Sequence, residues 1–178
     1  QSKEEIWTLR GLERRENNYK KMLSDGSRQL ASVAAVNKWI GQAIGQYNPT
    51  LTAYNLPFDL DKCKNSGIDL TGFNDKFCLW AAALGNLCDT KAYRNFALDN
   101  HLFTNRTKLH NMTMRTSAEA VSHFVSGVDA VEPHSALEDV LDHEIPILIE
   151  VLKKKKWRAK ITPFNWRAFQ VKDHFNAK

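Results

Sequence analysis

Two polar residues lie where a short apolar segment meets a helix, and their chemistry suits a metal ion. The apolar run Leu51–Tyr54 lies between Pro49 and Pro57, a length and setting typical of a buried strand. Pro57 suits the first turn of the helix that follows. Asn55 and Asp59 therefore fall at the edge of an α/β sheet, where ligands usually bind. The Asp59 carboxylate could hold a cation there, although helix capping is the commoner role for such a pair.

A second polar pair opens the last long helix. His134 lies at the start of this helix, and Asp139 follows about a turn and a half later. The small side chain of Ala136 between them allows another group to approach closely. An imidazole with a pKa near 6.5 suits proton transfer at working pH. A structural alternative is that His134 caps the helix and Asp139 pairs with a lysine or arginine.

The composition is that of a soluble globular protein. With 178 residues, 43% hydrophobic and 25% charged, the chain is long enough to bury a core. No apolar stretch approaches the roughly 18 residues of a membrane span, and the first residues lack a signal-peptide pattern. Cys63, Cys78 and Cys88 are scattered, which argues against a zinc site or a disulfide framework. We therefore expect a cytoplasmic protein with no membrane partner.

Hydrophobic periodicity predicts a helix-rich α/β fold. The expected helices span residues 2–24, 33–47, 57–66, 81–87, 91–98, 118–125 and 133–155. Phe77–Trp80 is expected to be a second strand, parallel to the first because a helix separates them. Residues 101–115 have no clear assignment, and no antiparallel pair is expected. Trp39 and Phe124 should face the core, and Pro146 should kink the last helix.

Together, the two polar pairs resemble the DEDD-type 3′→5′ exonucleases of the histidine subclass, an RNase H-like family that includes proofreading subunits of DNA polymerases. The segment Asn55-Leu-Pro-Phe58-Asp59 is similar to the second motif of that family, Asn-x-x-Phe-Asp. His134-Ser-Ala136-Leu-Glu-Asp139 is similar to the third motif, His-x-Ala-x-x-Asp, and follows in the same order. The resemblance covers about residues 33–152 and implies an RNase H-like exonuclease fold.

The resemblance implies a metal-dependent phosphodiester hydrolase. Asp59 and Asp139 would be ligands of two Mg²⁺ or Mn²⁺ ions, which prefer carboxylate oxygens, and His134 would be the general base. Two such ions about 3.5–4 Å apart activate a water and stabilise both the attacking and the leaving oxygen. Asn55, Phe58 and Ala136 would bind the substrate, a single-stranded 3′ end of DNA rather than RNA. A DNA polymerase would be a further partner.

The first motif of the family, Asp-x-Glu on the first strand, has no counterpart before Val33. We expect that the chain lacks its N-terminal part and with it the first strands of the sheet. Two carboxylates are too few to hold both metals, so the isolated chain should be inactive or nearly so. A non-catalytic nucleic-acid- or polymerase-binding module of the same fold is the alternative, and an unrelated α/β domain with coincidental motifs is a third reading.

The positive charge is concentrated at the C-terminus. From Lys153 onward there are nine lysines or arginines and one aspartate, against sixteen basic and nineteen acidic residues before it. We therefore expect an exonuclease-like domain over residues 1–152 and a basic, aromatic extension over 153–178. Lys153, Lys154, Lys155 and Lys156 could neutralise phosphates, while nearby rings could stack on bases. Alternatively, the lysines complete a solvated helix end, and the aromatic residues pack on the core, which we favour for the rings.

Overall fold

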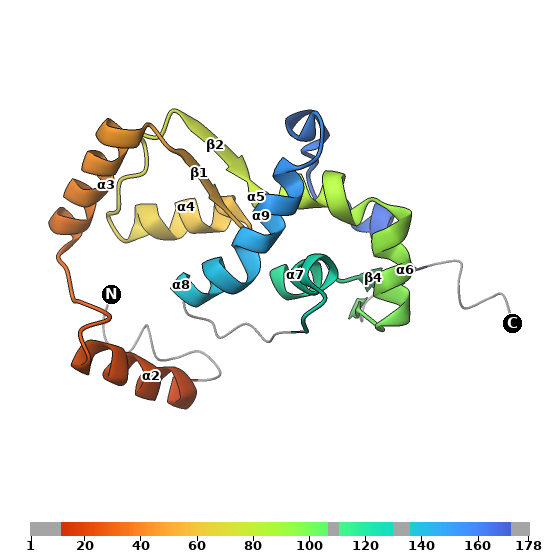
Figure 1. Ribbon diagram of the computed structural model, residues 1–178, viewed down its shortest axis with the longest axis horizontal. Helices are drawn as coiled ribbons and strands as arrows, with labels where there is room; N and C mark the ends of the chain where they lie inside the picture. The colour runs from red at the N-terminus through yellow and green to blue at the C-terminus, as the bar shows by residue number, and fades with distance from the viewer. Residues whose placement is uncertain (1–11, 107–110, 130–135, 172–178) are drawn as a thin grey trace, which may run out of the picture. The chain divides into compact units, whose positions relative to one another are not determined.

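A computed structural model describes residues 12–106, 111–129 and 136–171, and the chain divides into two compact units. Unit 1 contains residues 1–51 and 57–76, and unit 2 contains residues 52–56 and 77–178 (Figure 1). The expected helix-rich α/β class is confirmed, with two small sheets among many helices. None of the described helices has the length and apolar character needed to cross a membrane.

Unit 1 is largely helical. It contains α2 (Leu12–Ser24), α3 (Val33–Tyr47) and most of α4 (Leu56–Asn65). Ser32 caps α3, since its hydroxyl accepts a hydrogen bond of 3.2 Å from the Ala35 N–H. Asn37 fastens α3 to the loop after α4: its side chain donates to the Gly67 carbonyl and accepts from the Asp69 N–H, both at 2.9 Å.

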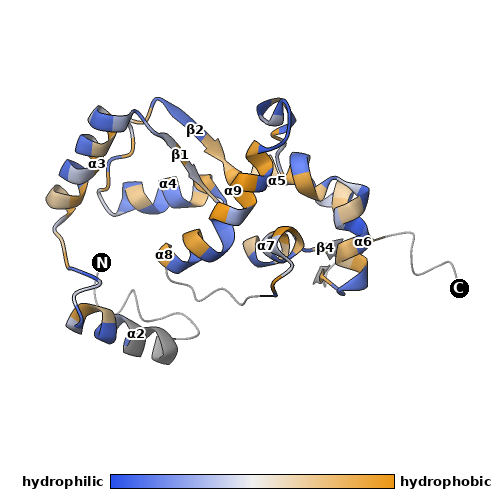
Figure 2. Cartoon of the chain, viewed as in Figure 1, coloured by the Kyte–Doolittle hydropathy of each residue, from blue (hydrophilic) through white to orange (hydrophobic). Residues whose placement is uncertain are grey.

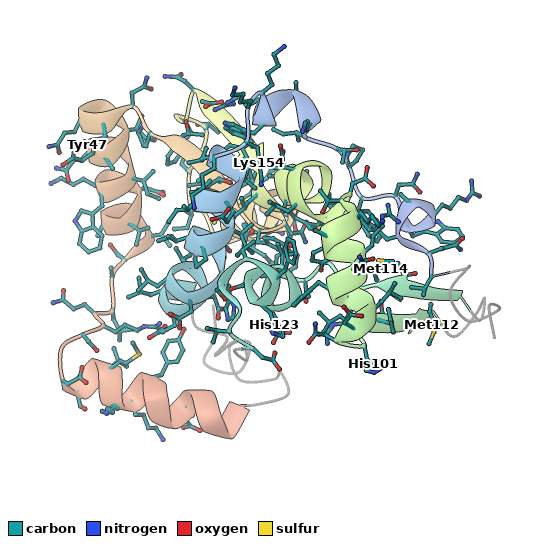
Figure 3. The ribbon with its side chains drawn as sticks, turned by 45° about the vertical axis from the view of Figure 1, so that its right-hand side comes forward. Tyr47, His101, Met112, Met114, His123 and Lys154 are labelled. Carbon is teal, nitrogen blue, oxygen red and sulfur yellow. The ribbon has the colours of Figure 1, made fainter. Side chains whose placement is uncertain are left out.

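The apolar residues of α3 form a stripe at helical spacing, but the prediction that Trp39 on this stripe faces the core is wrong. Helix α3 has no buried residue, and Trp39 keeps 57% of its surface exposed. Tyr47 also projects from the end of α3 (Figure 3). The described residues of unit 1 contribute none of the buried hydrophobic side chains, so this stripe has no core within its own unit to face.

The first sheet pairs β1 (Thr50–Ala53) with β2 (Asp75–Cys78). At the beginning of both strands, the Thr50 hydroxyl donates to the Asp75 carboxylate at 2.7 Å. Just beyond the ends of both, the Tyr54 and Trp80 rings lie 6.5 Å apart. The strands therefore run parallel, as expected.

The strand predicted over Phe77–Trp80 is displaced toward the N-terminus. Strand β2 ends at Cys78, and Leu79 and Trp80 begin α5 (Leu79–Ala83). The three alanines that follow favour a helix, and Leu79 is fully buried at its first position. Helix propensity beyond the apolar run thus decides where the strand ends.

An antiparallel hairpin occupies the stretch that had no clear assignment. Strands β3 (Phe103–Arg106) and β4 (Asn111–Met114) pair with Phe103 opposite Met114. The expectation that the fold has no antiparallel pair is therefore wrong. Each strand has four residues, too few for the alternating pattern to stand out in the sequence.

The hydrophobic core lies in unit 2. Helices α5, α6 (Lys91–Asp99), α7 (Ala118–Ser126) and α9 (Ile145–Leu152) surround it with the π-helical turn η1 (Leu84–Cys88). Figure 2 shows the strongly hydrophobic character of α9.

The 3₁₀ turns η3 (Trp157–Lys160) and η4 (Trp166–Phe169) follow. Phe169 is buried, and Trp157 and Phe164 pack against the core, which confirms the favoured reading of the aromatic residues. Phe124 also packs there, partly buried.

The last helical run is interrupted, as Pro146 leads one to expect. It consists of α8 (Ala136–Asp139), the π-helical turn η2 (Val140–Glu144) and α9. Pro146 has no N–H to donate to the carbonyl of Asp142 four residues earlier. The Ser122 hydroxyl of α7 donates to that carbonyl at 3.1 Å instead. The hydrogen bond lost at the proline is thus replaced by one that ties α7 to η2.

Candidate active site

A cavity in unit 2 brings together two residues from separate sequence motifs. It has a volume of about 330 Å³, and Asn55 and Asp139 both line it. The other lining residues are Tyr54, Trp80, Thr116, Ser117, Ala118 and Glu144. The cavity therefore joins the end of β1, the start of α5, the start of α7 and the last helical run.

Asn55 holds a backbone conformation that few residue types adopt easily. Its φ of 76° lies in the left-handed region, at the junction between β1 and α4. Glycine tolerates this region because it has no Cβ to approach the following carbonyl, and asparagine tolerates it because its short amide side chain can hydrogen-bond locally. Asn55 thus has two roles here: it turns the chain, and it lines the cavity.

These two roles can be separated by substitution. We expect Asn55→Gly to leave the free energy of unfolding within about 0.5 kcal/mol of the original, since glycine accepts the same φ. Asn55→Ala removes the same amide but should lower that free energy by about 1 kcal/mol. Urea denaturation of both variants checks this. Equal stability of the two would show that the left-handed conformation is not retained in solution.

Thr116 forms part of the cavity wall because two aromatic residues hold it. The Tyr54 hydroxyl donates to the Thr116 carbonyl at 2.6 Å, and the Trp80 indole N–H donates to its hydroxyl at 3.1 Å. Thr116 itself is only 7% exposed. The sequence motifs do not point to this wall, because its hydrogen bonds link residues 36 and 62 positions apart. Through Thr116, these two hydrogen bonds join the end of β1 to the start of α5.

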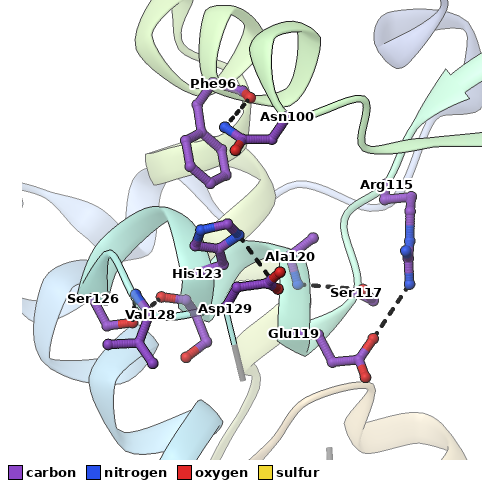
Figure 4. Close-up of polar contacts among 11 residues, drawn as sticks. Phe96, Asn100, Arg115, Ser117, Glu119, Ala120, His123, Ser126, Val128 and Asp129 are labelled. Carbon is purple, nitrogen blue, oxygen red and sulfur yellow. Dashed lines mark hydrogen bonds and ion pairs between the residues drawn. The ribbon is translucent and has the colours of Figure 1, made fainter. Parts of the chain in front are cut away.

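The first turn of α7 supplies the neighbouring part of the wall. Ser117 caps the helix by accepting from the Ala120 N–H, and Arg115 pairs with Glu119 at 3.3 Å (Figure 4). Both contacts fix the chain where Ser117 and Ala118 meet the cavity. His123, further along α7, faces Asp129 at 3.7 Å and does not line the cavity.

The π-helical turn η2 explains why a second carboxylate reaches the cavity. Asp139 and Glu144 are five residues apart, which would place them on different faces of a regular α-helix. The Ile145 N–H donates to the Val140 carbonyl, a bond that spans five residues. This wider turn puts both carboxylates on the cavity side. Glu144 was not identified from the sequence, since only the structure reveals the extra residue in the turn.

Two further predicted site residues, Asp59 and Phe58, do not line this cavity. Asp59 and Phe58 belong to α4 in unit 1. Burial raises the pKa of the Asp59 carboxyl, and a hydrogen bond with its own backbone N–H opposes this in part. Phe58 is 55% exposed, with the Lys62 ammonium 5.1 Å from its ring centre. That Asp59 and Asp139 share a metal stays a prediction.

The third motif is only partly within the described residues. His134 lies outside them, so its role as a base stays a prediction. Ala136 is the exposed first residue of α8. Within residues 12–106, 111–129 and 136–171, no group of three acidic, histidine or cysteine side chains could hold a metal ion. The described part of the chain thus offers a pair of carboxylates, Asp139 and Glu144, at one cavity.

No protein-family model, curated protein or solved structure matches this chain. The functional proposal therefore depends on the two motifs and on the cavity of unit 2.

Proposed function

We propose that the protein is a metal-dependent 3′→5′ exonuclease that hydrolyses single-stranded DNA ends, with an RNase H-like fold. The cavity lined by both Asn55 and Asp139 is the observation that carries this proposal. These residues are 84 positions apart and belong to different motifs, yet they line one hollow of a size suited to a small polar group. A coincidental pair of motifs gives no reason for this proximity.

The side chains in this cavity suit a hard divalent cation. Asp139 and Glu144 provide carboxylate oxygens, the ligand type that Mg²⁺ and Mn²⁺ prefer, and no cysteine lines the cavity. When bound, such ions would activate a water and stabilise the charge on the reacting oxygens. Asp139 is the proposed ligand at this cavity, and Asp59 stays the ligand that the resemblance predicts. The Asn55 amide can hydrogen-bond a sugar or a phosphate oxygen of the terminal nucleotide, and His134 is the proposed base.

The direct test compares this chain with the longest form that its gene encodes, called the extended protein below. The substrate is a single-stranded oligonucleotide labelled at its 5′ end, with Mg²⁺ present. We expect the extended protein to shorten it from the 3′ end, and the 178-residue chain to be at least about 100-fold slower, because two carboxylate motifs cannot hold both metals.

Two controls accompany this assay. Chelation of Mg²⁺ should stop the extended protein, and a phosphorothioate at the 3′-terminal linkage should slow it while an internal one leaves the first cleavage unaffected. If the extended protein hydrolyses the oligonucleotide no faster than the 178-residue chain, the exonuclease proposal fails.

A non-catalytic module of the same fold is the second candidate. The lack of a three-ligand metal group among the described residues favours it. If this candidate is correct, both the 178-residue chain and the extended protein would bind the oligonucleotide without shortening it. Binding without hydrolysis therefore separates the two functions.

A further inference from the structure

A rigid, strongly basic turn follows α9 and is not part of the cavity. This basic turn, Lys153–Lys160, contains five lysines and one arginine in eight residues, and no acidic residue follows until Asp173. Lys153 to Lys156 are all exposed, and Figure 3 shows Lys154 at the end of α9. Lys153 pairs with Glu150. Lys154, Lys155 and Lys156 make no ion pair with the residues that the structure describes.

The backbone of the basic turn is fixed to the core of unit 2. The Asn86 amide donates to the Trp157 carbonyl at 3.0 Å and to the Ala82 carbonyl at 2.9 Å. Just after the turn, the Thr162 N–H donates to the Ala81 carbonyl at 3.1 Å. Asn86 is buried, so water does not compete for its bonds. These bonds hold the lysines on a framework that is already ordered before any ligand binds.

Trp157, the aromatic residue of the basic turn, packs within unit 2. The Trp157 ring lies 4.8 Å from the ring of Phe77, and the Arg158 guanidinium lies 4.8 Å from the Trp157 ring. Insertion into a lipid surface needs exposed aromatic or aliphatic side chains beside the cations. In this turn the ring is packed and the exposed charged groups are the lysine ammonium ions and the Arg158 guanidinium. The aliphatic side chains beside them, Ile149 and Leu152 of α9, are about half exposed, two against six cations. The chemistry of the turn therefore suits a flexible polyanion more than a membrane.

We propose that the basic turn binds the phosphate backbone of single-stranded nucleic acid, several nucleotides away from the 3′ end. This rests on the proposed function, because it names where that substrate's upstream part would bind. Asp139 and the turn belong to one helical run in unit 2, and thirteen residues at 1.5 Å each separate Asp139 from Leu152 by about 20 Å. A strand whose end occupies the cavity could reach the lysines with its following phosphates.

The test removes three cations without disturbing the turn. The variant carries Lys154→Gln, Lys155→Gln and Lys156→Asn, since Lys156 has a φ of 56° that asparagine tolerates. A control with the same loss of charge carries Lys21→Gln, Lys38→Gln and Lys91→Gln, all exposed and distant in sequence. The probe is a fluorescein-labelled oligothymidylate of about 16 nucleotides, the upper end of common single-strand site sizes, with EDTA present so that no metal contributes.

We expect removal of the three cations to weaken the salt dependence of oligonucleotide binding. The slope of log Kobs against log[salt] should become shallower by about 2, from three cations at about 0.7 each on a single strand. The control should keep the original slope. An unchanged slope in the variant, or an equal change in the control, overturns the proposal. A variant that loses only its binding to vesicles of phosphatidylserine and phosphatidylcholine would identify a membrane surface and overturn it too.

A further assay distinguishes failure of the basic-turn proposal from failure of the proposed exonuclease function. Hydrolysis of a dinucleotide, which is too short to reach the turn, should be the same in the lysine variant and in the original extended protein. If the extended protein hydrolyses nothing but the slope changes, only the exonuclease proposal fails. If hydrolysis occurs and the slope does not change, only the role of the basic turn fails.

Discussion

Replacing Asp139 by asparagine in the extended protein should lower the rate of the proposed exonuclease reaction by at least about 1,000-fold, equivalent to roughly 4 kcal/mol of transition-state stabilisation. Asparagine keeps the size of the side chain but has no charge to hold a divalent cation. Asp139 lines the cavity of unit 2, so the substitution alters the site while leaving the core unchanged. The measurement is the initial rate of 3′-end shortening at saturating Mg²⁺.

Asp142→Asn is the matched control for this substitution. Asp142 is exposed in the π-helical turn η2, just after Asp139, does not line the cavity, and accepts the Ser122 hydrogen bond through its backbone carbonyl. The control loses the same charge three residues away and should change the rate less than twofold. A similar loss in both variants would mean that overall charge, and not a metal ligand, sets the rate.

The sequence predicted those elements whose ends are determined by neighbouring residues. Helix α7 is the clearest example, since Ser117 caps its start and Gly127, with a φ of 73°, ends it. Helix α3 begins after Ser32 for the same reason. The break at Pro146 was also predictable, because the missing N–H is a property of the residue itself.

The sequence did not predict features that depend on distant residues. Thr116 joins the cavity through hydrogen bonds from Tyr54 and Trp80, and no local pattern indicates these. Glu144 reaches the cavity only because η2 is wider than an α-helix. For the candidate site, Asn55 and Asp139 were therefore predicted from motifs, whereas most of the wall that surrounds them was not.

The exposure of α3 shows a second reason why the sequence did not predict the structure. Its apolar spacing matches a core-facing helix, yet Trp39 is 57% exposed. Periodicity reports which residues share a face, and it does not report whether another element covers that face. The hairpin of β3 and β4 was missed for the opposite reason. Its strands pair in the structure, but each strand is too short to show a hydrophobic period in the sequence.

Gly85→Ala should lower the free energy of unfolding by about 3 kcal/mol, the upper part of the range for overpacked sites. A Cβ at Gly85 would overlap the Lys160 carbonyl oxygen and lie 3.2 Å from the Thr162 methyl group. The first of these neighbours is backbone, so rotation of a side chain cannot relieve the overlap. Either η1 or the end of the basic turn must move, and the bonds from Asn86 and Thr162 would weaken with it.

Gly41→Ala in α3 gives the opposite expectation and serves as the control. Apart from the backbone of α3 itself, no atom of the described residues lies within 4 Å of a Cβ added there, so alanine should raise stability by about 0.5–1 kcal/mol through its helix propensity. Urea denaturation followed by circular dichroism measures both variants. If Gly85→Ala also proves neutral or stabilising, the backbone of the basic turn does not lie against η1 in solution. The rigid framework on which the lysine proposal depends would then be absent, so this one substitution tests both the packing and the binding surface.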